Sequence, residues 1–298
     1  MKAALLPDRG VVKVEGRDAR KFLNGLVTAD IGKVTPAVPC FAALLTPQGK
    51  IIVDFIVVGN EPPDEDCFLL DCPRSLSPTL VERLGFYKLR AKVGIENQSE
   101  ILGVLAIWDG AAPTYFGVNY PDPRLPELGL RCIAPPYPAD AAAAFGAELV
   151  DAAAYEAFRI ARGVPCGGLD FVYGDAFPHE ADMDQLHGVD FQKGCFVGQE
   201  VVSRMEHRGS ARTRVVPVIF AGAAPSAGIA VTADGKPVGT MGAAAAGRAL
   251  AMLRLDRVDE ALAAGASLRA GGTELRLIKP AWARFAFPGD PAQPKVAK

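Results

Sequence analysis

A cysteine between two glycines is the most unusual feature of the stretch FQKGCFVGQEVVSR, residues 191–204. Gly194 and Gly198 permit backbone conformations closed to other residues, so the loop can present Cys195 to a binding partner. Lys193 lies two positions before the cysteine and could lower the thiol pKa if the two side chains meet. The pattern predicts a reactive or ligand-contacting cysteine. A buried cysteine that packs as a small apolar side chain explains it about equally well.

The residues that follow this loop predict a helix. Gln199 and Glu200 would begin it, and Glu200 could pair with Arg204 one turn later. No nucleophilic triad is apparent. The chain has neither a Gly-x-Gly-x-x-Gly nor a Walker pattern, which leaves nucleotide binding of those kinds without support.

An acidic stretch, PHEADMD, lies upstream and carries Glu180, Asp182 and Asp184. A carboxylate can accept two N–H groups from a flat heterocycle such as a pterin. Composition alone favours the alternative, an exposed acidic loop.

Composition limits the class of protein. The chain has 298 residues, 50% hydrophobic and 22% charged, which predicts a globular protein of about two domains. Its net charge of −2 and the lack of a long basic run argue against bulk binding to nucleic acid. The count of only 3 histidines argues against a histidine-based metal site.

The cysteines and the N-terminus bear on the compartment. The chain has 6 cysteines and no C-x-x-C pair, so we expect reduced thiols rather than a zinc ribbon or a disulfide framework. There is no signal-peptide or transit-peptide pattern, and no apolar run long enough to span a membrane. These features predict a cytoplasmic protein without membrane contact.

The elements that must position these residues follow from periodicity and turn signals. We expect α+β structure first, then a small antiparallel β-barrel from about residue 211. Asp18 and Asp151 are expected to cap helices. The segment 164–195 lacks the hydrophobic periodicity of a helix or strand, which predicts a long structured connection that carries functional residues. The expected strands are 10–16, 40–45, 51–59, 67–72, 91–99, 101–108 and 130–135, and the expected helices are 18–31, 78–90 and 151–163.

The string KGCFVGQEVVSRM closely resembles the K-G-C-[YF]-x-G-Q-E signature of the YgfZ family of folate-binding proteins. That family is related to the glycine cleavage T protein, an aminomethyltransferase. The stretches LPDRGVVKVEGRDARKFLNGLVTADI, LTPQGKIIVDFIV and YEAFRIARGVPCGGLDF resemble the family's opening, its hairpin and the helix before its binding loop. KPVGTMG, ALAMLRLD and KPAW resemble the terminal barrel, so the likeness covers nearly all of residues 1–287.

The resemblance implies a fold and a division into domains. Residues 1–209 would form a T-protein-like folate-binding domain of intertwined subdomains around a central cavity. Residues 210–288 would form a C-terminal β-barrel, and 289–298 a disordered tail.

The resemblance also implies a function. The ligand would be tetrahydrofolate or a one-carbon derivative, and the role the upkeep of iron–sulfur proteins, including enzymes that modify tRNA. Cys195 and Lys193 would carry the chemistry. The residues implied at the folate site and around the motif are Glu180, Asp182, Asp54, Gly194, Gly198, Gln199, Glu200 and Arg204. A lone cysteine cannot hold a stable cluster, because clusters take about four ligands, so no resident metal or cluster is expected.

Two departures from the family pattern affect the chemistry. The T protein has two successive aspartates where this chain has Val53 and Asp54, which leaves the transferase site incomplete or altered. The binding loop often reads E-x-N, whereas here Asp182 follows Glu180; an aspartate lacks the two N–H donors of asparagine. Whether any reaction is catalysed stays open.

Two alternatives therefore remain: a folate-dependent aminomethyltransferase, and a scaffold without enzymatic activity. The expected partners are folate and iron–sulfur client or assembly proteins, with no direct nucleic acid contact. The expected oligomeric state is a monomer.

Overall fold

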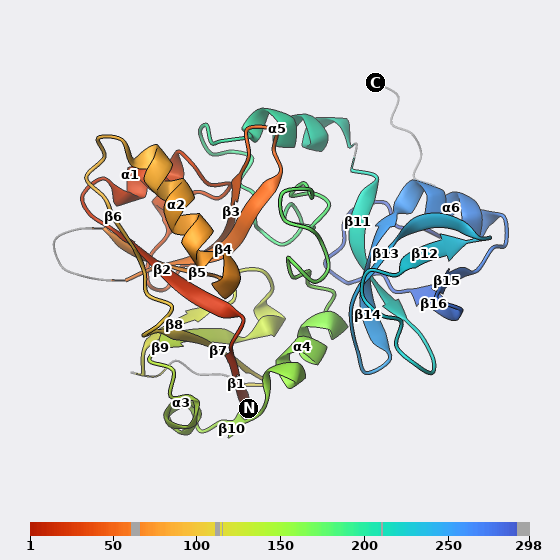
Figure 1. Cartoon of the computed structure of the whole chain (residues 1–298), viewed down its shortest axis with the longest axis horizontal. Coiled ribbons are helices and arrows are strands. Elements are labelled where there is room, and N and C mark those ends of the chain that lie inside the picture. The colour runs from red at the N-terminus through yellow and green to blue at the C-terminus, as the bar shows by residue number, and fades with distance from the viewer. Residues whose placement is uncertain (61–65, 111–113, 115, 210, 291–298) are drawn as a thin grey trace.

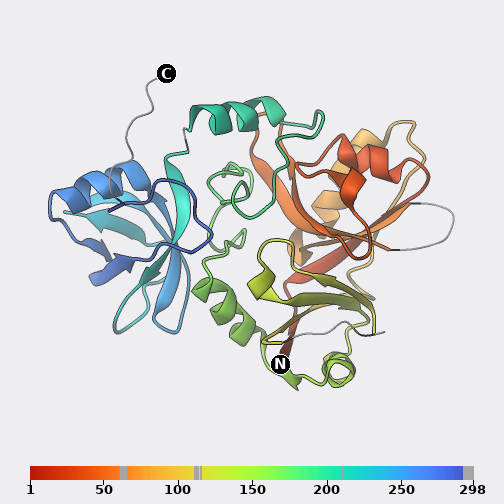
Figure 2. The ribbon, with the colours of Figure 1, turned by 180° about the vertical axis from the view of Figure 1, so that it is seen from behind.

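The computed structural model describes residues 1–60, 66–110, 114, 116–209 and 211–290. Its strands form two five-stranded sheets and one closed barrel. Figure 1 shows the blue barrel at one end, the two sheets at the other, and a green segment between them; Figure 2 shows the same order from behind. The predicted α+β architecture with a terminal antiparallel barrel is confirmed.

One sheet has the strand order β3-β4-β5-β2-β6 and is antiparallel throughout. Helices α1 and α2 cover it, because Leu23 of α1 and Leu80 of α2 share an apolar cluster with Phe55 of β4. The elements are β2 (Arg9–Glu15), α1 (Ala19–Asn24), β3 (Cys40–Leu45), β4 (Ile51–Gly59), β5 (Cys67–Pro73), α2 (Ser77–Lys88) and β6 (Gly94–Asn97), with short 3-10 turns at Ile31–Lys33 and Arg74–Leu76.

The other sheet has the order β10-β1-β7-β9-β8. Its central strand β7 is buried along its whole length. The chain enters this sheet with β1, builds the first sheet completely, and returns with β7, so the two are intertwined as predicted. The elements are β1 (Lys2–Leu6), β7 (Gly103–Trp108), β8 (Val118–Pro121), β9 (Leu130–Ala134), α3 (Pro138–Phe145) and β10 (Glu148–Leu149), with a 3-10 turn at Pro126–Leu128.

A long connection joins the sheets to the barrel. Helix α4 (Ala152–Ala161) begins at Asp151, whose carboxylate accepts a hydrogen bond from Ala154 N at 2.9 Å, so the predicted cap is confirmed. Residues 162–198 then carry no helix or strand, apart from one isolated bridge. Helix α5 (Gln199–Arg208) follows and leads into the barrel.

The barrel closes in the order β11-β14-β13-β12-β15-β16. Helix α6 lies against it and buries Leu255 and Val258 in the barrel's own apolar cluster. The elements are β11 (Thr213–Ile219), β12 (Ala230–Ala233), β13 (Lys236–Ala245), β14 (Arg248–Arg254), α6 (Leu255–Ala263), β15 (Leu268–Ala270) and β16 (Thr273–Leu277). Among the described residues, no helix is both long and apolar enough to cross a bilayer.

The structure corrects the sequence interpretation in a few places. Asp18 precedes α1 but does not cap it; its carboxylate accepts a hydrogen bond from Lys92 N instead. The sequence analysis did not predict β1, β8, β10, α3 or α6. The strands and α3 are short or alanine-rich, whereas the amphipathic spacing of α6, which buries Leu255 and Val258, was missed. Most of the predicted disordered tail, from residue 291, lies outside the described residues.

Candidate functional site

The loop that carries the K-G-C motif is held by its lysine. Lys193 Nζ donates to the backbone carbonyls of Asn24, Val27 and Ala29, each at 2.7 Å. An ammonium group has three N–H donors, so these carbonyls use all of them and none remains for the Cys195 thiol. Burial lowers the pKa of Lys193 to about 8. The structure thus gives Lys193 a positioning role, and its predicted effect on the thiol pKa stays a prediction.

The two glycines of the motif differ in what they do. Gly198 has a φ of 80° at the start of α5, and a Cβ atom there would lie 2.6 Å from Thr46 O. Gly194 has no left-handed φ, and an added Cβ would meet nothing within 4 Å. The prediction that glycine shapes this loop therefore holds for Gly198 and is wrong for Gly194, whose backbone any residue could adopt.

Cys195 is the exposed thiol of the chain. Cys67, Cys72 and Cys132 are buried, and Cys40 and Cys166 are intermediate. Burial raises the pKa of Cys40, Cys72 and Cys132 to about 12 and that of Cys166 to about 11. Because the thiolate is the reactive form, chemistry with an outside partner falls to Cys195.

Helix α5 begins directly after this loop, at Gln199, as predicted. The carboxylate of Glu200 accepts a hydrogen bond from the Arg204 guanidinium, so the expected pair one turn apart is present. Both side chains are largely exposed, at 84% and 53%. Such a pair adds little to stability and leaves both charges accessible near Cys195 in the sequence.

Asp54 lies on β4 and is buried. Its carboxylate accepts a hydrogen bond from the Tyr173 hydroxyl. Burial, followed by the nearby Asp54 charge, raises the pKa of Tyr173 well above its ordinary value, so the hydroxyl keeps its proton. The Tyr173 ring packs on Gly167, where an added Cβ would lie 2.1 Å from Tyr173 Cζ.

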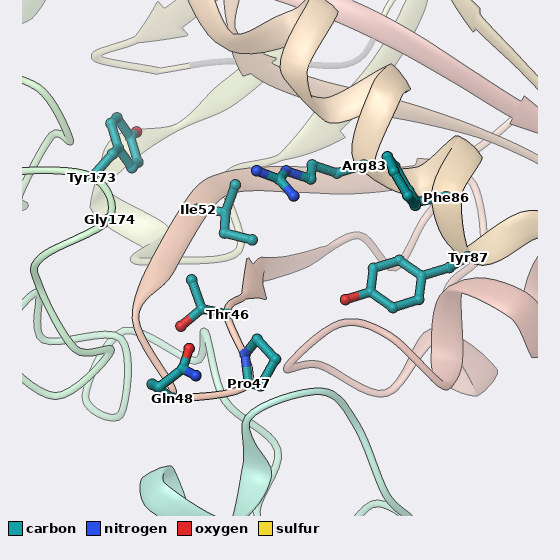
Figure 3. Close-up of a pocket in the computed structure, with 9 residues that line it drawn as sticks. All are labelled: Thr46, Pro47, Gln48, Ile52, Arg83, Phe86, Tyr87, Tyr173 and Gly174. Carbon is teal, nitrogen blue, oxygen red and sulfur yellow. The ribbon is translucent and has the colours of Figure 1, made fainter.

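A pocket of about 550 Å³ opens beside this pair (Figure 3). Aromatic rings from α2 and the central connection line it, together with the β3–β4 turn and one cation, Arg83. No ion pair or hydrogen bond of the Arg83 side chain occurs among the described residues. The lining residues are Thr46, Pro47, Gln48, Ile52, Arg83, Phe86, Tyr87, Tyr173 and Gly174.

Sequence reasoning missed the α2 contribution to this pocket. Leu80 and Leu84 form the buried face of α2, whereas Phe86 is 72% exposed and Tyr87 37% exposed. Two adjacent aromatic residues away from the apolar stripe of a predicted helix are a signal that could have found the pocket.

The predicted acidic loop is bonded internally. The Glu180 carboxylate accepts a hydrogen bond from Phe177 N at 2.9 Å. Asp182 is fully buried with a φ of 56° and pairs with Arg214 of β11 at 2.9 Å. Burial raises the pKa of Asp182 well above its ordinary value, and Arg214 only partly opposes this shift. Neither acid lines the 550 Å³ pocket, and the interpretation as an exposed acidic loop is wrong for Asp182.

The β3–β4 turn contacts each of these regions. Gly49 lies against Gly198 of the K-G-C loop. The ammonium of Lys50 lies 3.5 Å from the centre of the Phe177 ring, next to Glu180. Thr46, Pro47 and Gln48 line the pocket. The start of α5, the acidic loop and the pocket thus all meet this turn, although Asp54, Glu180 and Cys195 do not share one pocket.

A second cavity of about 270 Å³ is lined by arginines between the two sheets and α4. Asp122 bonds Arg124 at 2.6 Å and Arg131 at 2.9 Å, and Arg131 also bonds Asp71 at 2.6 Å. Burial acts to raise the pKa values of Asp71 and Asp122, but the arginines outweigh it and hold both below their ordinary range. No pattern in the sequence predicted this network.

Comparison with known proteins identifies the family of this chain. Residues 212–285 match the model of the CAF17 C-terminal β-barrel domain. The chain is 31% identical over 279 residues to the human iron-sulfur cluster assembly factor IBA57, mitochondrial, and the match covers 85% of this chain and 77% of the human protein. The chain belongs to the IBA57 family.

Other members of the IBA57 family are longer. The homologue from Mycosarcoma maydis is 38% identical over 244 residues, and that from Neurospora crassa 32% over 249 residues. The chain spans 60% and 56% of the length of these two relatives. All three relatives are named as mitochondrial, so the cytoplasmic location expected for this chain stays a prediction.

The fold is shared with a more distant protein. The crystal structure of the glycine cleavage system aminomethyltransferase T from Bartonella henselae superposes with a TM-score of 0.74 over 96% of this chain and 87% of that one. Identity is 16%, so this likeness establishes the fold alone. The predicted T-protein-like architecture is confirmed, whereas the narrower resemblance to YgfZ, which comes from the K-G-C motif, stays a prediction.

Proposed function

We propose that the protein supports the assembly or maintenance of iron–sulfur proteins, with Cys195 as its contact to the cluster or thiol of a partner. The observation that carries this proposal is an exposed cysteine on a loop held at both ends, by Lys193 on one side and Gly198 on the other. The names of the family members support the same role.

The cluster would be cargo shared with a partner. Iron–sulfur clusters usually need about four ligands, and Cys195 is the one exposed thiol of this chain. A partner protein must therefore supply the remaining ligands, and the contact would be transient.

Folate binding is the second part of the proposal. The 550 Å³ pocket has the size and lining typical of small-molecule sites. A flat ring system could stack on Phe86 and Tyr87, and an anionic tail could pair with Arg83. Tyr173, which lines the pocket and bonds Asp54, would offer polar atoms to a pterin. Glu180, which bonds within its own loop, would act by fixing that loop beside Lys50.

The role in iron–sulfur protein upkeep can be tested in cells that lack this protein. We expect lower activity of [4Fe–4S] enzymes, with unchanged activity of enzymes that contain no cluster. Equal activity of both classes in deleted and intact cells would overturn the proposal.

The folate proposal has a separate test. Calorimetric titration with tetrahydrofolate should show binding that weakens about tenfold or more in Arg83→Gln, since the charge-assisted pair is lost. Arg74→Gln is a matched control, because Arg74 precedes α2, pairs with Glu100 and does not line the pocket. Absence of binding to wild-type protein, or equal loss in both variants, would contradict the assignment of this pocket.

A further inference from the structure

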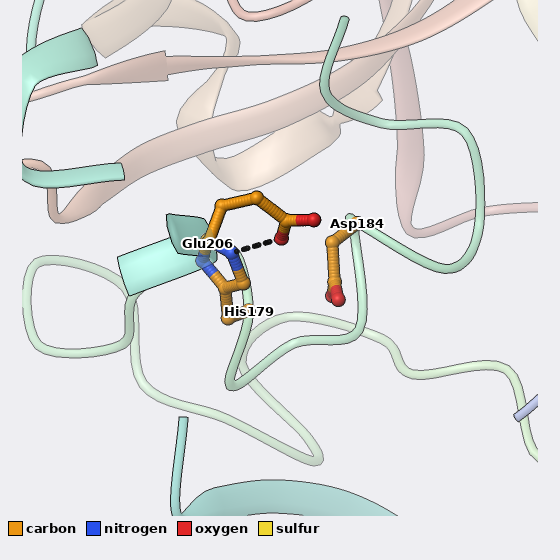
Figure 4. A group of neighbouring side chains, drawn as sticks. All are labelled: His179, Asp184 and Glu206. Carbon is orange, nitrogen blue, oxygen red and sulfur yellow. Dashed lines mark hydrogen bonds and ion pairs between the residues drawn. The ribbon is translucent and has the colours of Figure 1, made fainter. Parts of the chain in front are cut away.

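His179, Asp184 and Glu206 come together where α5 crosses the central connection (Figure 4). One ligand atom from each lies within 4.8 Å of the other two. His179 Nε2 and Glu206 Oε2 are 3.0 Å apart. The His179 ring is buried, and Phe191 lies beside it with ring centres 5.9 Å apart.

Charge is unbalanced around this histidine. Arg214 bonds Asp182 and both oxygens of Asp184, each contact at 2.9 Å. Glu206 adds a third acid, which bonds the His179 ring. Because burial raises the pKa of Asp182, the negative charge beside the ring comes mainly from Asp184, which Arg214 offsets, and from Glu206.

Polar atoms without partners concentrate in the same place. The described part of the chain has five buried side-chain nitrogen or oxygen atoms without a hydrogen-bond partner, and three of them belong to His179, Asp182 and Arg214. Each of these residues is more than nine-tenths buried. Buried polar groups almost always find partners, so these exceptions point to water or another ligand bound at this place. Arg214 Nε–H can only donate, so its partner would be water rather than a cation.

We propose that His179, Asp184 and Glu206 form a binding site for one divalent first-row transition-metal ion. A mixed imidazole and carboxylate donor set suits the Zn²⁺ and Fe²⁺ class rather than soft, thiolate-bound ions. The carboxylates of Asp184 and Glu206 would supply negative charge to the ion.

Metal binding needs a rearrangement of the carboxylates. Metal–ligand bonds of about 2.1 Å in a tetrahedral site place ligand atoms about 3.4 Å apart, so the 3.0 Å separation of His179 and Glu206 must widen and separations of up to 4.8 Å must shrink. The Glu206 side chain is 45% exposed and free to make that movement. Asp184 keeps lone pairs while bonded to Arg214, which would act as the outer partner that orients a ligating carboxylate.

The site is separate from the proposed function, because none of its ligands lines the 550 Å³ pocket and none is a cysteine. A bound ion would join α5, which follows the K-G-C loop, to the connection at residues 179–184. The small number of histidines in the sequence argued against a histidine-based metal site. The fold nevertheless brings two acids to His179, namely Asp184, 5 positions later in the chain, and Glu206, 27 positions later.

The test is a titration of the Cys195→Ser protein with Zn²⁺ by calorimetry and with Co²⁺ by visible absorption. We expect one ion per chain and a cobalt spectrum without a thiolate charge-transfer band. Glu206→Gln should weaken binding by about tenfold or more. Glu200→Gln, an exposed acid on the same helix, should leave the affinity unchanged.

Three results would overturn the site: no binding of either ion to Cys195→Ser, equal affinity in Glu206→Gln, or equal loss in Glu200→Gln. Thermal unfolding of Glu206→Gln and Glu200→Gln is measured without metal. Equal unfolding temperatures show that weaker binding by Glu206→Gln does not come from a folding defect. His179→Gln provides a second ligand variant, and undiminished binding by it also contradicts the proposal.

Discussion

Gly49 and Gly198 face each other where the β3–β4 turn meets the start of α5. A Cβ atom on Gly198 would lie 3.1 Å from Gly49 Cα and 2.6 Å from Thr46 O, and its φ of 80° disfavours any other residue. This contact fixes one end of the loop that presents Cys195.

Gly198→Ala should therefore destabilise the protein by about 2 to 4 kcal/mol, from backbone strain and overpacking together. Gly194→Ala is the matched control in the same motif, and it should change stability by no more than about 0.5 kcal/mol. Urea unfolding of both variants measures this difference. Equal effects of the two substitutions would show that the glycines do not differ as described.

Lys193 fixes the other end of the loop. Lys193→Met keeps the aliphatic stem but leaves three carbonyls without their donor, so we expect a loss of at least about 2 kcal/mol in unfolding free energy and faster proteolysis of the loop. Lys33→Met, which removes an exposed lysine paired with Asp30 and Asp190, serves as the control. A larger effect of the control would contradict the role of Lys193.

The six cysteines should differ sharply in reactivity. Cys195 is exposed, whereas the shielded thiols have pKa values raised by burial. Native protein treated with iodoacetamide at pH 8 should take up one label per chain, and Cys195→Ser should take up none on the same time scale. Intact mass spectrometry gives the count. Rapid modification of a second cysteine would show that the fold opens more than the structure indicates.

The Asp122 network predicts a pH dependence. Burial acts to raise the pKa of Asp122, but Arg124 and Arg131 outweigh it and lower the pKa. As the pH falls below about 4, Asp122 takes up a proton in the unfolded chain before it does so in the folded protein. The contribution of its ion pairs to the free energy of unfolding is therefore present at neutral pH and is lost in acid.

Asp122→Asn should accordingly cost about 3 to 5 kcal/mol at pH 7, where it leaves the buried Arg124 without its acidic partner and Arg131 with Asp71 alone. The difference from wild type should shrink at pH 3. Urea midpoints at the two pH values measure it. A difference that stays constant between them would contradict the lowered pKa.

The sequence predicted the features that depend on neighbours along the chain. The cap at Asp151, the β3–β4 turn and the Glu200–Arg204 pair all follow from local spacing, and the structure contains them. Contacts between distant segments were not predictable. Lys193 meets carbonyls more than 160 positions away, and Asp182 meets Arg214 only because β11 returns to the central connection.

The pocket could not be predicted from the sequence for the same reason. Asp54 was predicted to contact folate, but its partner Tyr173 and the lining residues Arg83 and Phe86 come from other elements. Spacing cannot reveal that α2 and the central connection meet over the β3–β4 turn.

The most direct test of the account is the activity of a [4Fe–4S] enzyme in cells whose only copy of this protein carries Cys195→Ser. We expect activity as low as in cells without the protein, whereas Cys40→Ser, which changes a shielded cysteine, should retain wild-type activity at equal protein levels. Full activity with Cys195→Ser would contradict the central claim that this exposed thiol carries the function.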